Sequence, residues 1–201
     1  MIGARAARPA AAGLLGYILG TLPSAAIAAR LAGSTGSIGS VGTGNPGAYN
    51  AATQLGPRWG VAVGAADVLK GVLAALAGRA LDGDRGVYTA STAAVAGHTY
   101  PPRRRGGKGI ATSFGTCMVA FPVWVPADLA IGAAVLYLRR DAGSGDRAAP
   151  AAKACTATFL AVGTLWAWRG WPNWGGPRGR KGLFAYVLGT SLLTGSRWLR
   201  R

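Results

Sequence analysis

The sequence predicts an all-α, polytopic membrane protein, and three observations indicate this fold class. Half of the 201 residues are hydrophobic and the mean hydropathy is +0.27, whereas charged residues make up only 14%, against roughly 25% in soluble domains. Apolar tracts of about 15 to 23 residues recur along the chain, close to the roughly 20 that a helix needs to cross a bilayer. Short glycine-rich and basic segments separate these tracts. We expect one integral membrane domain over residues 1–201.

Seven membrane helices are expected, at about 10–32, 58–80, 86–99, 109–122, 125–139, 151–168 and 182–198. The first follows two arginines, as a signal peptide would, but it exceeds the 7–15 apolar residues of such a signal, so we expect it to be retained. The fourth and fifth are alternatively one bent helix, because Pro122 and Pro126 interrupt the tract.

Small residues inside the tracts are expected to serve helix packing. Gly16 and Gly20 have the four-residue spacing that lets two helices approach closely. Cys117 and Cys155 both lie in apolar tracts, where a free cysteine behaves as a small apolar residue. A disulfide or a metal site is the less favoured alternative for these cysteines.

The charge of the chain is strongly basic, with a net charge of +16 from 22 Lys and Arg against six acidic residues. In a soluble protein this would indicate nucleic acid. Here the basic residues lie between apolar tracts, so attraction to anionic lipid head groups explains them and no nucleic-acid partner is expected. Seven helices would place twelve basic residues on the side of the glycine-rich loops and eight on the other. This difference favours a cytoplasmic loop side in the cell membrane.

The first glycine-rich loop spans residues 41–50 and reads VGTGNPGAYN. Glycine allows tight turns in which backbone N–H groups converge on an anion, and polar side chains add hydrogen bonds. A turn between two helices that binds no ligand is the alternative. The candidate binding residues are Gly42, Thr43, Gly44, Asn45, Gly47 and Asn50.

The second glycine-rich loop follows His98, the only histidine of the chain, and contains Arg105, Gly106, Gly107 and Lys108. The histidine could bind a phosphate or move a proton near neutral pH. Lys108 is expected to open the next helix, where its ammonium and the free N–H groups could serve one anion. The alternatives are an interfacial polar histidine and an arginine cluster that only sets membrane topology.

Asp67 and Lys70 lie inside the second apolar tract, where an ionisable residue is costly unless it is paired or faces a polar cavity. Their spacing of three residues allows pairing across one helical turn. The pair therefore indicates a polar interior.

Four ordered motifs together resemble the bacterial acyl-phosphate:glycerol-3-phosphate acyltransferases, the PlsY type of integral membrane enzyme. They are GTLP at 20–23, the first loop at 41–50, ADVLKG at 66–71, and GHTYP at 97–101 followed by RGGKGIAT at 105–112. Two departures stand out. Gly39 occupies the place of a family arginine, and the family's C-terminal motifs are absent after residue 140, where RWLR at 197–200 supplies only basic charge.

The resemblance implies transfer of a fatty acyl group from acyl phosphate to sn-glycerol 3-phosphate, which gives lysophosphatidic acid for phospholipid biosynthesis. An acyl phosphate is already activated, so the protein has to position two anions and stabilise developing charge. Neither a cofactor nor a metal ion is implied. The proton of the attacking hydroxyl could go to His98 or to a substrate phosphate.

The resemblance also implies two walls of a polar pocket. Arg104 or Arg105, which are close to Lys108 in sequence, could replace the charge of the arginine lost at Gly39. Residues of the first loop form one wall, and the second is formed by His98, Lys108, Gly106 and Gly107. Thr21 would lie at the pocket floor, with Asp67 and Lys70 as support.

Three other functions stay open. The chain could be a divergent or catalytically impaired paralogue with another acyl acceptor, or a non-enzymatic membrane protein that binds anionic lipid. A small anion transporter is disfavoured because the sequence has no internal repeat. The oligomeric state and the acyl-chain preference are not predicted.

Overall fold

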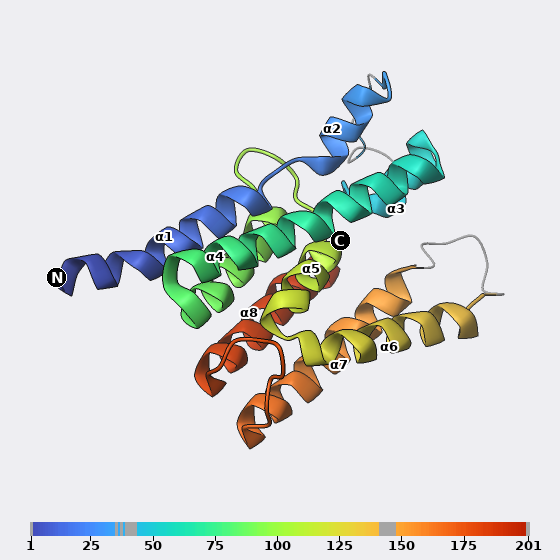
Figure 1. The fold of residues 1–201 in the computed structure, drawn as a ribbon. Coiled ribbons are helices and arrows are strands. Elements are labelled where there is room, and N and C mark those ends of the chain that lie inside the picture. Colours follow the sequence, from blue (N-terminus) through green and yellow to red (C-terminus); the bar gives the residue numbers. More distant parts are fainter. Residues whose placement is uncertain (1, 35, 37, 39–43, 141–147, 200–201) are drawn as a thin grey trace.

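The structure is a computed structural model and describes residues 2–34, 36, 38, 44–140 and 148–199. Within these residues every regular element is a helix, which confirms the all-α prediction (Figure 1). The elements are α1 (Ile2–Gly20), α2 (Ser24–Leu31), α3 (Ala48–Leu55), α4 (Pro57–Thr99), α5 (Ile110–Ala120), the short 3-10 helix η1 (Pro122–Trp124), α6 (Val125–Leu138), α7 (Ala148–Arg169) and α8 (Arg180–Leu199).

The prediction of one helix over 10–32 is wrong, because the chain leaves the helical path at Thr21–Pro23. Pro23 has no N–H to donate and disfavours helical geometry at Leu22. The carbonyl of Leu22 accepts a hydrogen bond from the ammonium of Lys70 in α4, at 3.1 Å. The break therefore supplies a backbone acceptor to a buried cation.

Helix α3 is a second difference from the sequence prediction, which has a loop as far as Asn50. The structure begins α3 at Ala48. Gly60 of α4 lies so close to α3 that a Cβ there would be 2.4 Å from the Cβ of Ala52. Short helices with few large apolar residues take their stability from such packing rather than from local preference.

Helix α4 contains both helices predicted at 58–80 and 86–99, which fold back on each other at Asp82 and Gly83. Gly83 has φ of 57°, a left-handed value that glycine adopts without strain. A Cβ on Gly78 would lie 2.2 Å from the carbonyl oxygen of Gly86. The two arms of α4 therefore touch backbone to backbone near the turn.

Helix α1 packs along α4 (Figure 1). It runs in the same direction as the second arm of α4, and small residues form the contact between them. Cβ atoms on Gly16 and Gly20 would lie 2.3 and 2.1 Å from the carbonyl oxygens of Ala90 and Ala94. The spacing of these glycines thus serves close helix packing, as the sequence predicts.

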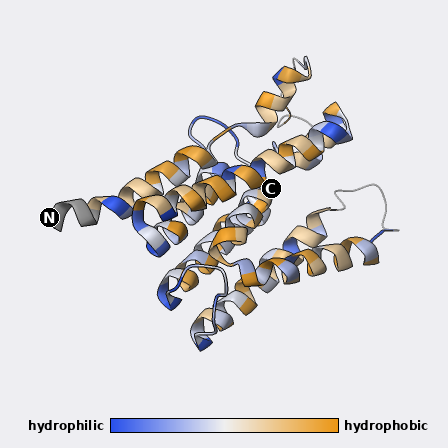
Figure 2. Cartoon of the chain, viewed as in Figure 1, coloured by the Kyte–Doolittle hydropathy of each residue, from blue (hydrophilic) through white to orange (hydrophobic). Residues whose placement is uncertain are grey.

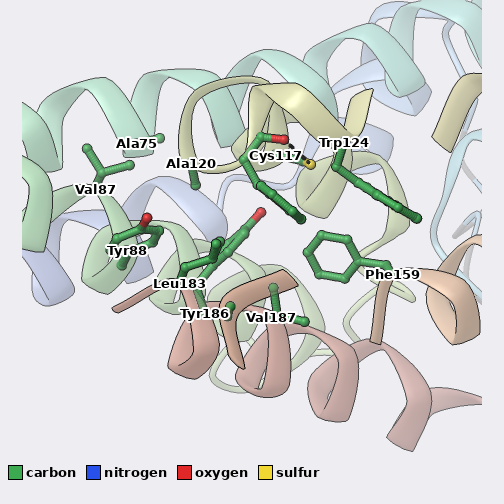
Figure 3. Packing of buried hydrophobic residues seen from close by; sticks show 12 residues of the cluster. Ala75, Val87, Tyr88, Cys117, Ala120, Trp124, Phe159, Leu183, Tyr186 and Val187 are labelled. Atoms are coloured by element: carbon green, nitrogen blue, oxygen red, sulfur yellow. Dashed lines mark hydrogen bonds between the residues drawn. The ribbon is translucent and has the colours of Figure 1, made fainter. Parts of the chain in front are cut away.

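The helices predicted at 109–122 and 125–139 are present as α5 and α6, bent by 116° at η1. The bend lies beside an aromatic cluster in which the ring of Phe121 is 6.2 Å from those of Trp124 and Phe159. Trp124 and Phe159 are labelled in Figure 3. Cys117 is buried in the same cluster. It and Cys155 are free thiols in the structure.

Three helical stretches of the described residues are long and apolar enough to cross a membrane: Ala7–Leu31, Pro57–Thr99 and Ala148–Arg169. The bent pair of α5 with η1 and α6 adds a fourth if it is one broken span. The predicted count of seven spans is therefore not confirmed. Hydrophobic residues recur along the helices, as Figure 2 shows. Large exposed ones include Leu14, Leu31, Val61 and Leu192. An apolar exterior of this kind is what a lipid environment favours.

Candidate active site

The carboxylate of Asp67 lies at the centre of a buried polar cluster in the first arm of α4. Its Oδ1 is 2.8 Å from the Nζ of Lys70, which confirms the predicted pair. The same oxygen accepts a hydrogen bond of 2.8 Å from the Oγ of Ser24, just after the break between α1 and α2. Both charged residues are about 96% buried. A buried cation needs such a partner because removal from water is costly.

His98 closes this cluster from the end of the second arm of α4. Its Nδ1 is 3.6 Å from the Oδ1 of Asp67, and its side chain is only 9% exposed. The second glycine-rich loop folds over the other side of the ring, where Gly107 donates its N–H to the carbonyl of His98 at 3.1 Å. The fold-back of α4 brings Asp67 and His98 together although they are far apart in sequence.

Positions 106 and 107 require glycine because the loop packs too closely against its neighbours for a side chain to fit. A Cβ on Gly107 would lie 2.1 Å from His98 Nε2, and one on Gly106 would lie 2.1 Å from the carbonyl oxygen of Thr99. Gly109 then has φ of 81° and α5 begins at Ile110. The expectation that Lys108 opens the helix is therefore wrong by two residues.

The ammonium of Lys108 lies over the indole ring of Trp198, 4.1 Å from its centroid, near the end of α8. Lys153 of α7 also approaches this ring, at 5.2 Å. The neighbouring Arg197 donates to the carbonyl oxygen of Gly106 at 2.7 Å. Sequence reasoning missed these contacts because it assigned residues 197–200 only a basic charge.

The first loop reaches the second loop. A Cβ on Gly44 would lie 3.3 Å from an Nη1 atom of Arg105, and Asn45 and Gly47 line a cavity together with Lys108. Gly42 and Thr43 lie outside the described residues.

Asn50 contacts the segment before α3. It is buried in α3, its amide donates to the carbonyl of Ile38 at 3.3 Å, and it lines neither of the cavities beside His98. Its expected place in the pocket wall stays a prediction, since the described residues do not show it in either cavity. The side chain ties α3 to the segment before it, which the sequence pattern could not separate from ligand binding.

Two cavities meet at Asp67 and His98, which line both. The first has a volume of about 420 Å³ and is the more basic. Its wall includes Thr21, Ser24, Lys70, Arg104, Arg105, Gly106 and Gly107. The hydroxyl of Thr21 donates to the carbonyl of Ile18 at 2.7 Å.

The second cavity has a volume of about 440 Å³ and extends between α4, α5 and α7. Asn45 and Lys108 lie in its wall with Asp67 and His98, whereas Val68, Ile110, Phe114 and Ala152 supply apolar surface. The site therefore joins a basic chamber to an apolar one, with His98 between them.

Known proteins are similar to this chain in sequence and in fold. A family model described as Glycerol-3-phosphate acyltransferase matches residues 10–194. The glycerol-3-phosphate acyltransferase of Thermoanaerobacter sp. (strain X514) is 45% identical over 100 residues, which are 49% of this chain and 50% of the relative. Glycerol-3-phosphate acyltransferase 1 of Deinococcus radiodurans is 40% identical over 136 residues, 66% of this chain and 67% of the relative. The match to the first of these relatives thus covers half of that relative's length.

Two crystal structures of PlsY, an integral membrane glycerol 3-phosphate acyltransferase, are similar to the whole fold. The glycerol 3-phosphate form has a TM-score of 0.76 at 25% identity and covers 94% of this chain and 87% of that one. The lysophosphatidic acid form has a TM-score of 0.72 with the same coverage. The likeness therefore extends through α6, α7 and α8, beyond the four motifs.

Proposed function

The chain belongs to the glycerol-3-phosphate acyltransferase family, and from that premise we propose that it transfers a fatty acyl group from acyl phosphate to sn-glycerol 3-phosphate at the cytoplasmic face of the cell membrane. The junction of the two cavities at His98 supports this function most directly. Such a junction lets a small polar acceptor and a lipid-like donor meet while each keeps its own surroundings.

The basic cavity is proposed to hold glycerol 3-phosphate. Arg104 and Arg105 offer guanidinium groups suited to a phosphate, and Lys70 lies in the same wall. Arg105 also lies beside Gly44 of the first loop. This contact supports a role for Arg105 in place of the arginine that the family has at the position of Gly39.

The apolar cavity is proposed to hold acyl phosphate. The acyl chain would lie among Val68, Ile110 and Phe114, and the phosphate near Lys108 and Asn45. Asn45 Oδ1 is buried and has no hydrogen-bond partner among the described residues. A bound substrate would supply a polar partner for this atom, because buried polar groups are normally hydrogen-bonded.

The reaction needs only positioning and charge stabilisation. The glycerol hydroxyl oxygen bonds to the acyl carbonyl carbon, the bond from that carbon to the phosphate oxygen breaks, and inorganic phosphate leaves with the electron pair. The positive charge of Lys108 would stabilise the departing phosphate. The hydroxyl proton passes either to His98 or to a phosphate oxygen, and a His98→Gln variant that keeps most of its rate would identify the phosphate as the acceptor.

The test uses purified protein with palmitoyl phosphate and glycerol 3-phosphate, and follows phosphate release. Lys108→Ala is expected to abolish turnover, since a group that stabilises transition-state charge is worth about 100- to 1,000-fold. Lys153→Ala is the matched control, because Lys153 approaches the same Trp198 ring but is exposed and does not line the apolar cavity. If the Lys108 variant keeps full activity, the site assignment is wrong.

If the wild-type protein releases no phosphate in this assay, the proposed acyl acceptor is wrong, whereas the description of the fold is unaffected. Gly39→Arg restores the family residue at a position outside the described residues. If only this variant is active, the chain is a divergent paralogue that uses another acceptor.

A further inference from the structure

The largest of the described cavities, about 810 Å³, lies at the opposite end of the helical bundle from His98. It is formed by the turn of α4 and by the 170–179 segment that joins α7 to α8. Helix α8 begins here at Arg180, whereas Arg197 near its other end contacts the active-site loop. Seventeen residues of helix separate the two ends by about 26 Å, close to the roughly 30 Å of a hydrocarbon core. The cavity therefore lies at the level of the other leaflet.

Positive charge collects in this cavity. Arg79, Arg178 and Arg180 line it, against one carboxylate, that of Asp84. Asp84 accepts a hydrogen bond of 2.8 Å from the backbone N–H of Arg178. In the described part of the chain no salt bridge engages Arg79 or Arg178. Loops on the side away from the cytoplasm usually carry few basic residues, so topology does not account for these arginines.

Two tryptophans place the cavity at the level of lipid head groups. Trp171 and Trp174 line it and are 45% and 67% exposed. The ring of Trp171 stacks edge-on against Trp166 of α7, with centroids 5.1 Å apart. Exposed indole rings are enriched at the boundary between hydrocarbon and water. Arginine beside such rings is suited to a lipid phosphate.

Asn173 adds a second polar feature to the cavity wall. Its amide nitrogen donates to the carbonyls of Ala120 and Pro177, at 2.9 and 3.1 Å. Its Oδ1 is buried and has no hydrogen-bond partner among the residues that the structure describes. An acceptor left in this state favours a ligand that brings a donor, such as a hydroxyl.

We propose that this cavity binds the headgroup of an anionic phospholipid that carries both a phosphate and a free hydroxyl. Arg79 and Arg178 hold the phosphate, Asn173 accepts the hydroxyl, and the acyl chains lie along the exposed apolar faces of α7 and α8. The lipid belongs to the leaflet opposite the active site, so this site is distinct from the one for substrates.

The experiment measures lipid binding to purified, delipidated wild-type protein by native mass spectrometry. Phosphatidylglycerol is titrated beside phosphatidylcholine and phosphatidylmethanol, which has the same charge as phosphatidylglycerol but lacks the hydroxyls. Phosphatidylglycerol is expected to bind most tightly. Arg79→Gln and Arg178→Gln are each expected to weaken its binding about fivefold, the equivalent of about 1 kcal/mol per basic residue.

Arg169→Gln is the matched control. Arg169 lies at the same end of the bundle, over the ring of Trp168, but does not line the cavity. Arg178→Lys keeps the charge and is expected to retain most of the binding, which separates lost charge from lost folding. Equal weakening by the control, or no weakening by Arg79→Gln and Arg178→Gln, would overturn the proposal. Displacement of the lipid by millimolar inorganic phosphate would show a site for free anion and overturn the lipid assignment.

Discussion

Gly107→Ala is expected to slow acyl transfer about 100-fold while the protein stays folded. The Cβ that Gly107 lacks would lie 2.1 Å from His98 Nε2 and 3.0 Å from the carbons beside it. Ordinary contact begins at 3.4 Å, so the loop and the ring must separate by about 1.3 Å. A misplacement of about 1 Å between groups that position reactants can cost about 100-fold in rate.

The backbone itself should tolerate the alanine. Gly107 is not among the described residues with positive φ, and its N–H bond to the carbonyl of His98 does not depend on the side chain. The assay is phosphate release from palmitoyl phosphate at saturating glycerol 3-phosphate, which reports kcat. Gly195→Ala in α8 is the control, because no heavy atom lies within 4 Å of its added Cβ.

Two outcomes would refute this reasoning. A Gly107→Ala protein with the wild-type kcat would show that the contact between the loop and His98 does not position the reaction. An equal loss of kcat in Gly195→Ala would show that the assay reports general helix perturbation. Circular dichroism and size-exclusion profiles check that both variants keep their helices.

The remaining predictions concern the buried ion pair and the ring beneath Lys108. Asp67→Asn removes the anion that Lys70 and Ser24 contact at 2.8 Å, and is expected to lower the free energy of unfolding in mixed micelles by about 3–5 kcal/mol. An unchanged unfolding curve would contradict this, and a further Lys70→Met change should recover part of the loss. Trp198→Ala is expected to raise the KM for palmitoyl phosphate about tenfold, because a cation over an indole is worth about 0.5–2 kcal/mol. Trp198→Phe should retain most of the affinity, and equal KM values in all three proteins would disprove the role of the ring.

The sequence predicted most of the helices because long apolar tracts are a strong signal for membrane helices. The sequence prediction missed the break before Ser24 because the apolar tract continues through the break, although Pro23 disfavours a continuous helix there. It missed α3 because a short helix such as Ala48–Leu55, next to a glycine-rich loop, has no distinctive period. The count of membrane spans was the weakest prediction, since length and hydropathy do not reveal where a helix bends.

The candidate site was predictable where motif residues are close in sequence or follow helical spacing. Asp67 and Lys70 pair as their spacing indicates. Trp198 was missed because its role depends on the path of α8, which only the folded chain reveals. Asn50 was assigned to the pocket because a polar side chain in a glycine-rich loop looks the same in sequence whether it binds a ligand or a neighbouring backbone.

The glycine contact at the turn of α4 has a consequence for how the protein is made. Gly78 and Gly86 are in contact and only eight positions apart in sequence. The two arms can therefore pair as soon as both have left the ribosome. Closing so short a loop costs little chain entropy. A helical hairpin inserted in one step would already set His98 beside Asp67 before α5 is synthesised. Half of the reaction centre would then be assembled during translation, and later helices would only have to dock onto it.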